Sequence, residues 1–211
     1  YHDGYKAHAS IETHVATCYF EGPQGLAGFE YDLVKSFADH LGVKVKCVVT
    51  DSFNEMIPAL LRGEADLIAA GFTVTENRMR RVAFGPPYME VQQQVVGRRG
   101  GPSPDDIGDL IGHPLWVNAG TSYEERLKEL KSQYPGLSWL AVSGYETEEI
   151  LEMVWRGIIP LTIADSNIVA VNRRYYPQLR IHFAIQEGEQ LAWAVHPQHN
   201  RLLAAVEHWF A

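Results

Sequence analysis

Apolar residues recur three and four positions apart in the stretch that begins at Gly28 and ends at Gly42. This spacing predicts a helix with one apolar stripe, and glycine is a common stop signal. Residues 43–49 then alternate between polar and apolar side chains and are rich in valine, as in a half-buried strand. Helical spacing returns in residues 52–64, and an apolar run follows in residues 65–71. The pattern therefore predicts alternating strands and helices, which is typical of a parallel sheet covered by helices.

A second series of elements follows the segment GGPSPDD at residues 100–106, where glycine and proline crowd together. Before this segment, residues 89–99 predict an extended run. After it, we expect strands at 114–118, 137–142, 160–164 and 179–185, and helices at 121–136, 146–157 and 165–177. The last stretch predicts one strand and one helix, which we expect to pack on the first lobe. The predicted domains are 9–97 plus 186–211 for the first lobe and 98–185 for the second.

Two α/β lobes joined by extended segments predict a hinged cleft that closes on a ligand. In such sheets, ligands bind beyond the carboxyl ends of the strands. The sequence therefore directs the search for a site to the residues that follow the predicted strands.

Composition narrows the class of ligand. The chain has 211 residues, 46% of them hydrophobic, and a formal charge of −8. This acidic balance argues against nucleic acid and favours a small solute, because phosphate binding needs a basic face. No apolar run is long enough to span a membrane. Cys18 and Cys47 could form one bridge or none, and His196 and His199 are best explained as surface residues, so we expect no metal and no cofactor.

Two stretches are suited to an anion. The apolar run 65–71 leads into Gly71, Thr73 and Thr75, and Arg78 follows them. An arginine can bind a carboxylate through two parallel hydrogen bonds. The other stretch is Gly120, Thr121 and Ser122, which begins the helix predicted at 121–136 and offers backbone N–H groups. The alternatives are a surface ion pair of Arg78 with Glu76 or Asp66, and a plain helix cap in which Thr121 and Glu124 form a capping box.

Asp165 follows the strand predicted at 160–164, where its carboxylate could receive a ligand ammonium group. Asp165 is an equally good N-cap for the next helix. Four aromatic side chains could form apolar walls for a ligand, although core packing is an alternative for two of them, Phe53 and Phe72. The four are Tyr19, Phe53, Phe72 and Tyr88. A cationic group at Arg78 and an acidic one at Asp165 would suit a zwitterion.

The stretches GFEYDLVKSFADHLGVKV, ADLIAAGFTVTENR, VAFGPPY and TIADS together resemble the bacterial extracellular solute-binding proteins of family 3, the amino-acid-binding type. The resemblance implies the α/β fold of periplasmic-binding-protein-like type II. It also implies that Arg78 holds the ligand carboxylate and that Gly120 to Ser122 and Asp165 contact the ligand. The first strand departs from the family, because THVATCYF stands where a polar loop is usual.

The stretches FGPPYMEVQQQVV, QYPGLSW and TIADSNIVAVNRRYYPQLRI are similar to the N-terminal domain of the membrane-bound lytic transglycosylase F family. That likeness implies a periplasmic regulatory domain, tethered to the outer membrane in the full-length protein, which senses an amino acid or a cell-wall peptide. Its partner would be a C-terminal catalytic domain that cleaves peptidoglycan. Because the sequence stops at VEHWFA, before the last helices of the usual lobe, we expect a fragment.

Two alternatives remain open from the sequence. The chain could be a free substrate-binding protein that delivers an amino acid to an ABC permease. It could also be a dehydratase of small carboxylates, because this fold carries such enzymes, with Glu21, Glu30 or Glu90 as the general acid. We expect all three carboxylates to be solvated, and no nucleophile triad, phosphate loop or zinc spacing is present. The sequence therefore favours a binding domain over an enzyme.

Overall fold

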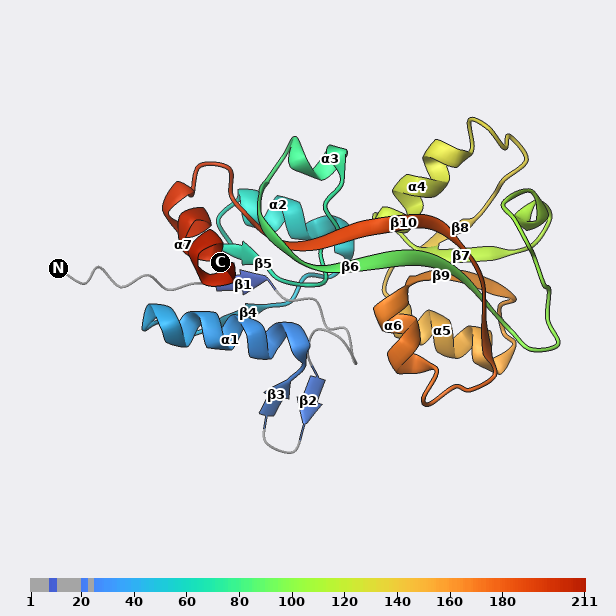
Figure 1. Cartoon of the computed structure of the whole chain (residues 1–211), viewed down its shortest axis with the longest axis horizontal. Helices are drawn as coiled ribbons and strands as arrows, with labels where there is room; N and C mark the ends of the chain where they lie inside the picture. Colours follow the sequence, from blue (N-terminus) through green and yellow to red (C-terminus); the bar gives the residue numbers. More distant parts are fainter. Residues whose placement is uncertain (1–7, 11–19, 23–24) are drawn as a thin grey trace. The chain divides into compact units, whose positions relative to one another are not determined.

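The computed structural model describes residues 8–10, 20–22 and 25–211, with side chains from Gly28 onward (Figure 1). The predicted wall residue Tyr19, the Cys18 half of the suggested bridge and the side chain of Glu21 lie outside the described residues. Contacts divide the chain into two compact units. Unit 1 comprises the residues up to Glu90 and those from Gln190 to Ala211, and unit 2 comprises Val91–Glu189.

Unit 1 is built on a short mixed sheet with helices. Its elements are β1 (His8–Ser10), β2 (Phe20–Gly22), β3 (Gly25–Ala27), α1 (Phe29–Leu41), β4 (Lys46–Val48), the 3-10 helix η1 (Phe53–Glu55), α2 (Met56–Leu61), β5 (Leu67–Ile68), α3 (Glu76–Met79) and α7 (Asn200–Phe210). Strand β1 pairs in parallel with β4 and β5. The end of strand β10 (Leu179–Val195) pairs with β5 in the antiparallel sense. The predicted parallel arrangement is therefore confirmed for β1, β4 and β5.

Helix α1 begins and ends where the hydrophobic pattern predicts. Gly42 adopts a left-handed conformation with φ of 68°, which glycine takes without a side-chain clash. The buried stripe packs into the core of unit 1, where the rings of Phe37 and Trp193 lie 5.4 Å apart. Trp209 of α7 contacts Phe37 from another direction, with ring centroids 6.0 Å apart. The stripe therefore ties α1 to both the sheet and the last helix.

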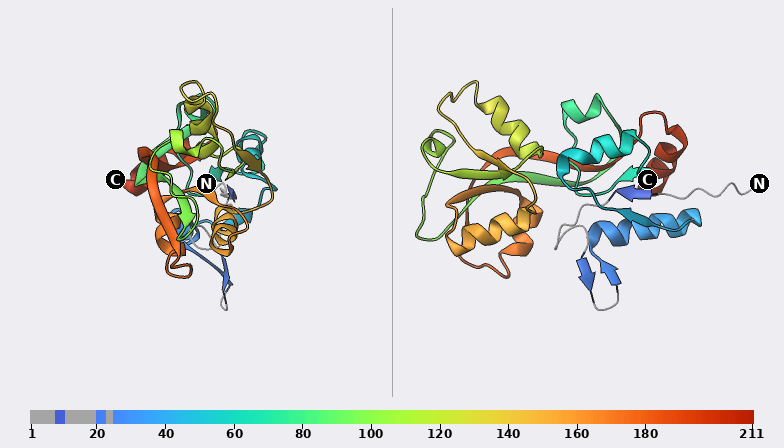
Figure 2. Two further views of the ribbon diagram at one scale, coloured as in Figure 1. Left: turned by 90° about the vertical axis from the view of Figure 1, so that its right-hand side faces the viewer. Right: turned by 180° about the vertical axis from the view of Figure 1, so that it is seen from behind.

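Unit 2 places helices on both faces of its sheet. Its elements are the second half of β6 (Ala83–Arg98), the 3-10 helix η2 (Gly108–Leu110), β7 (Leu115–Asn118), α4 (Ser122–Leu130), β8 (Leu140–Val142), α5 (Thr147–Arg156), β9 (Leu161–Asp165), α6 (Ser166–Asn172) and the first part of β10. Leu161 and Ile163 pack with α4 in one core cluster, while Ala164 packs with α5 and α6 in another. This alternation follows from the two-residue period of a strand. Figures 1 and 2 show α4 on one side of β7 and β9, and α5 and α6 on the other.

Strands β6 and β10 are neighbours in the sheet and run through both units (Figure 1). The sequence predicts a strand that ends at residue 185 and a separate one after it, but the structure has one continuous strand, Leu179–Val195. The residues between the two predicted strands include Gln186 and Glu187, yet ladder hydrogen bonds are made by the backbone and do not depend on side-chain polarity. The division between the units falls at 90/91 and 189/190, within these two strands. Among the described helices, none is long and apolar enough to cross a membrane.

Candidate ligand-binding site

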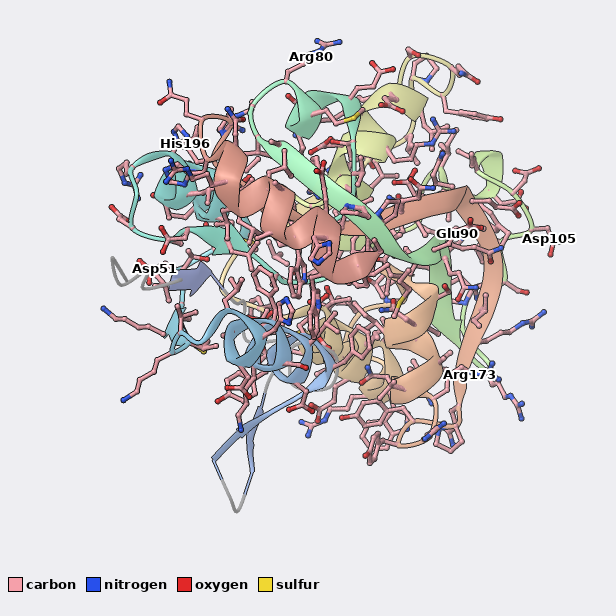
Figure 3. The ribbon with its side chains drawn as sticks, turned by 60° about the vertical axis from the view of Figure 1, so that its left-hand side comes forward. Asp51, Arg80, Glu90, Asp105, Arg173 and His196 are labelled. Carbon is pink, nitrogen blue, oxygen red and sulfur yellow. The ribbon has the colours of Figure 1, made fainter. Side chains whose placement is uncertain are left out.

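Arg78 lies on the short helix α3 of unit 1 and is only 2% exposed. Its backbone N–H donates to the side-chain oxygen of the N-cap residue Thr75 at 3.3 Å, and its guanidinium Nη1 donates to the carbonyl of Thr73 at 3.0 Å. Arg78 is therefore a buried residue and does not lie on the surface. The nearby Arg80 is exposed instead; it points away from the ribbon in Figure 3 and pairs with Glu76 at 3.6 Å.

Two aromatic rings pack against the guanidinium of Arg78. Its carbon Cζ lies 4.3 Å from the ring centroid of Phe72 and 4.9 Å from that of Phe53. The two rings are themselves stacked, with centroids 5.6 Å apart. A cation over an aromatic face is attracted by the negative potential of the ring, and the attraction grows when water is excluded. The two rings therefore hold the positive charge in a fixed orientation at the edge of the unit 1 core.

Glu30 is the main acceptor beneath this region, and the prediction that it is solvated is wrong. It lies in the first turn of α1, is 2% exposed, and accepts hydrogen bonds from Gly71 N and Trp193 Nε1, each at 3.0 Å. The hydroxyl of Tyr88 also donates to it. Gly71 has φ of 58°, a value that favours glycine. Glu30 thus fixes the start of the segment that leads to Arg78.

The start of helix α4 in unit 2 is capped differently from the prediction. Thr121 donates its hydroxyl to the carbonyl of Asn118 at 2.8 Å and makes no side-chain cap bond to the helix. Glu124 reaches one residue further back than a capping box would, and accepts from Gly120 N at 2.7 Å. Burial acts to raise the pKa of Glu124, but the N–H of Gly120 and the ammonium of Lys128 outweigh it and lower that pKa. An acidic side chain of the chain itself therefore occupies the anion position of this helix.

Asp165 ends β9 and is buried, as is the Tyr123 side chain beside it. The backbone N–H of Asp165 donates to the Tyr123 hydroxyl at 3.1 Å. Asp165 stands at the N-cap of α6 but makes no side-chain cap bond, so the predicted capping role is wrong. Gln93 of β6 lies directly opposite in the antiparallel register, which places its side chain on the same face of the sheet.

Several polar side chains around Asp165 were not identified from the sequence. Burial raises the pKa of Tyr123 well above its usual value, and the negative charges of Asp165 and Glu148 raise it further. Glu148 is buried at the start of α5, next to Thr147, which accepts from the side-chain amide of Asn118 at 3.2 Å. Tyr123 falls on the apolar stripe of its helix, so the pattern predicts a core residue. No feature of the sequence marks Glu148 or Gln93 as buried.

The two units therefore carry groups of opposite character. Unit 1 has the buried guanidinium of Arg78, and unit 2 has the buried carboxylates of Asp165 and Glu148. The predicted wall residue Phe72 is fully buried, whereas Phe53 and Tyr88 are partly buried. Among the described residues, no three His, Cys, Asp or Glu side chains are placed to hold a metal ion together.

The chain is similar to membrane-bound lytic murein transglycosylases along most of its length. Membrane-bound lytic murein transglycosylase F from Saccharophagus degradans is 41% identical over 187 residues, which cover 89% of this chain and 37% of that protein. Membrane-bound lytic murein transglycosylase F 1 from Alkalilimnicola ehrlichii is 42% identical over 180 residues, covering 85% and 36%. The chain thus spans little more than a third of the length of these relatives.

Solved structures share the fold. An ancestral arginine-binding protein bound to arginine superposes with a TM-score of 0.85 at 28% identity, covering 97% of this chain and 90% of that one. This likeness shows the periplasmic-binding-protein type II fold, as predicted. The family model of the bacterial extracellular solute-binding proteins, family 3, matches residues 9–211. This match and the two relatives confirm the resemblance drawn from the sequence motifs, and the chain belongs to family 3 of the bacterial extracellular solute-binding proteins.

Proposed function

We propose that this solute-binding domain recognises a small zwitterion, either a free amino acid or a cell-wall peptide. The observation that carries the proposal is the guanidinium of Arg78, which is buried and oriented by Phe53 and Phe72. A guanidinium presents its donors in a rigid fork that matches a carboxylate. Each hydrogen bond to a charged group contributes about 1.5–3 kcal/mol. Two hydrogen bonds from the guanidinium and two from other donors, at about 2 kcal/mol each, would together supply the roughly 8 kcal/mol that corresponds to micromolar affinity.

Within unit 2, a buried acidic cluster is the feature that is chemically suited to an ammonium group. Asp165 and Glu148 supply negative charge there, and the hydroxyl of Tyr123 lies at hydrogen-bond distance from the backbone of Asp165. Buried carboxylates are stabilised by a nearby positive charge. The solved arginine-binding relatives support an amino acid as the ligand class, since the ancestral protein is described as bound to arginine.

We further propose that ligand binding regulates a lytic transglycosylase domain in the full-length protein, in the periplasm and near the outer membrane. The support is the likeness to two transglycosylases of which this chain covers only 36–37%. The likeness to arginine-binding proteins supports a second candidate, a substrate-binding protein of an amino-acid importer. A dehydratase is not favoured, because Glu30 is engaged by three donors and Glu90 is exposed.

Isothermal titration with amino acids and cell-wall peptides tests the proposal. Replacing Arg78 with alanine should weaken binding of every ligand about 100-fold or more, since two charged hydrogen bonds are lost. Arg80→Ala is the matched control, because it removes an exposed arginine from the same segment and should leave affinity unchanged. Equal affinities for the Arg78 variant and the unmodified chain would refute the carboxylate site. The regulatory part is tested by measuring peptidoglycan cleavage by the full-length protein with and without the ligand.

A further inference from the structure

Five arginines gather at one end of unit 2. They come from three segments, namely the end of β6, the turn after α6 and the start of β10: Arg98, Arg99, Arg173, Arg174 and Arg180. We call these five residues the arginine face. Within the part of the chain that the structure describes, none of the five forms an ion pair. The chain as a whole has a formal charge of −8, so these five positive charges belong to an acidic protein.

Three contacts bring these segments together. The backbone N–H of Arg99 donates to the carbonyl of Gln178 at 2.9 Å, which joins the end of β6 to the start of β10. The guanidinium of Arg98 lies against Gly157, where an added Cβ would clash with its Nη1. The ring of Tyr176 stacks on Trp155 with centroids 4.9 Å apart, which fixes the turn after α6 against the end of α5.

Two large apolar side chains are exposed within the same region. Tyr175 is 73% exposed and follows Arg173 and Arg174 directly, while Ile158 is 64% exposed and follows Gly157. Figure 3 shows Arg173 on the outside of the unit, beyond the end of α6. The surrounding acids reduce this positive charge only in part. Asp105 lies near enough to act on His182 together with Arg180, and Glu152 is paired with Arg156 at the end of α5.

From this arrangement we propose that the arginine face docks the domain on an anionic phospholipid membrane. Arginine donors bind lipid phosphate groups, and each basic residue near an anionic leaflet strengthens attachment. Tyr175 and Ile158 would enter the boundary between headgroups and acyl chains, where an amphipathic tyrosine ring is favoured. Exposed apolar side chains among the arginines favour a bilayer over a soluble polyanion, because a polyanion offers them no apolar phase. The inference does not depend on the ligand proposed above.

Co-sedimentation with lipid vesicles tests the inference. The chain should bind vesicles that contain phosphatidylglycerol and phosphatidylcholine, fail to bind phosphatidylcholine alone, and dissociate as salt is raised. The double variant Arg173→Gln/Arg174→Gln should lower the partition coefficient about 30-fold. The matched control is Lys35→Gln/Lys44→Gln, which removes two exposed charges from unit 1 and should bind as the unmodified chain does.

A second pair of substitutions separates the apolar contribution from the charges. Tyr175→Ser/Ile158→Ser should weaken vesicle binding while its dependence on salt stays the same. All the substituted residues are exposed, and unchanged circular dichroism spectra establish that the variants fold. Binding to phosphatidylcholine vesicles as strong as to anionic ones would overturn the proposal. So would equal losses in the arginine and lysine variants, or binding to duplex DNA without binding to vesicles.

Discussion

Replacing Glu30 with glutamine should destabilise unit 1, because this carboxylate accepts from three donors inside the core. One oxygen accepts from Gly71 N and the Tyr88 hydroxyl, and the other accepts from Trp193 Nε1 at 3.0 Å. Glutamine keeps one acceptor oxygen and replaces the other with an NH₂ group, which cannot accept. At least one buried donor then loses its partner, at a cost of about 1–3 kcal/mol. The melting temperature should fall by roughly 2–4 °C for each kcal/mol.

Thermal unfolding followed by circular dichroism measures this loss. Asp32→Asn is the matched control, because it removes an exposed acidic charge from the same turn of α1. A double-mutant cycle with Trp193→Phe isolates the indole bond, and a coupling free energy of about 0.5–3 kcal/mol is expected. The reasoning is refuted if Glu30→Gln and Asp32→Asn lower the melting temperature by the same small amount, since Glu30 would then act only through its charge at the helix start.

Two further predictions concern unit 2. Burial and the charge of Arg180 lower the pKa of His182 below its ordinary value of 6.5, and Nε2 is buried with no hydrogen-bond partner among the described residues. The unfolded chain therefore binds the proton on His182 more readily than the folded chain does. The free energy of unfolding should be highest above pH 6.5 and should decrease as the pH is lowered from there, by at most about 1.4 kcal/mol per pH unit. In His182→Gln, the unfolding free energy measured below pH 6.5 should no longer show this dependence on pH. An unchanged dependence would contradict the assignment of the effect to His182. Tyr123→Phe removes the hydroxyl that accepts from Asp165 N, so urea denaturation should show a loss of about 1–3 kcal/mol, and no change in the midpoint would contradict it.

The parts of the fold that depend on local pattern are predictable from the sequence. Helix α1 matches the predicted stretch because its apolar spacing and the stop at Gly42 are both local features. Strand β10 was predicted as two strands, since the sequence pattern alone does not reveal backbone pairing. The reading of Arg78 as a ligand residue rests on its position after a strand, which is also a local feature.

Buried charge is the feature that the sequence does not reveal. The three donors to Glu30 named above are 41, 58 and 163 positions away along the chain. A short stretch of sequence therefore never contains both Glu30 and one of these donors. A helical wheel places Glu30 off the apolar stripe and predicts a solvated side chain. To predict that a carboxylate is buried, one must know its hydrogen-bond partners, and those partners are set by tertiary structure.

The same consideration separates the two anion sites that the sequence predicts. At the start of α4 the N–H of Gly120 already donates to Glu124, so a ligand carboxylate would have to displace an acidic side chain that is attached to the helix itself. At Arg78 the guanidinium is held by two rings and by the carbonyl of Thr73, which is a neutral acceptor. A guanidinium presents its donors in a rigid fork that matches the geometry of a carboxylate. The helix start in unit 2 is therefore better explained as a structural cap, and we propose unit 1 as the place for the carboxylate of a ligand.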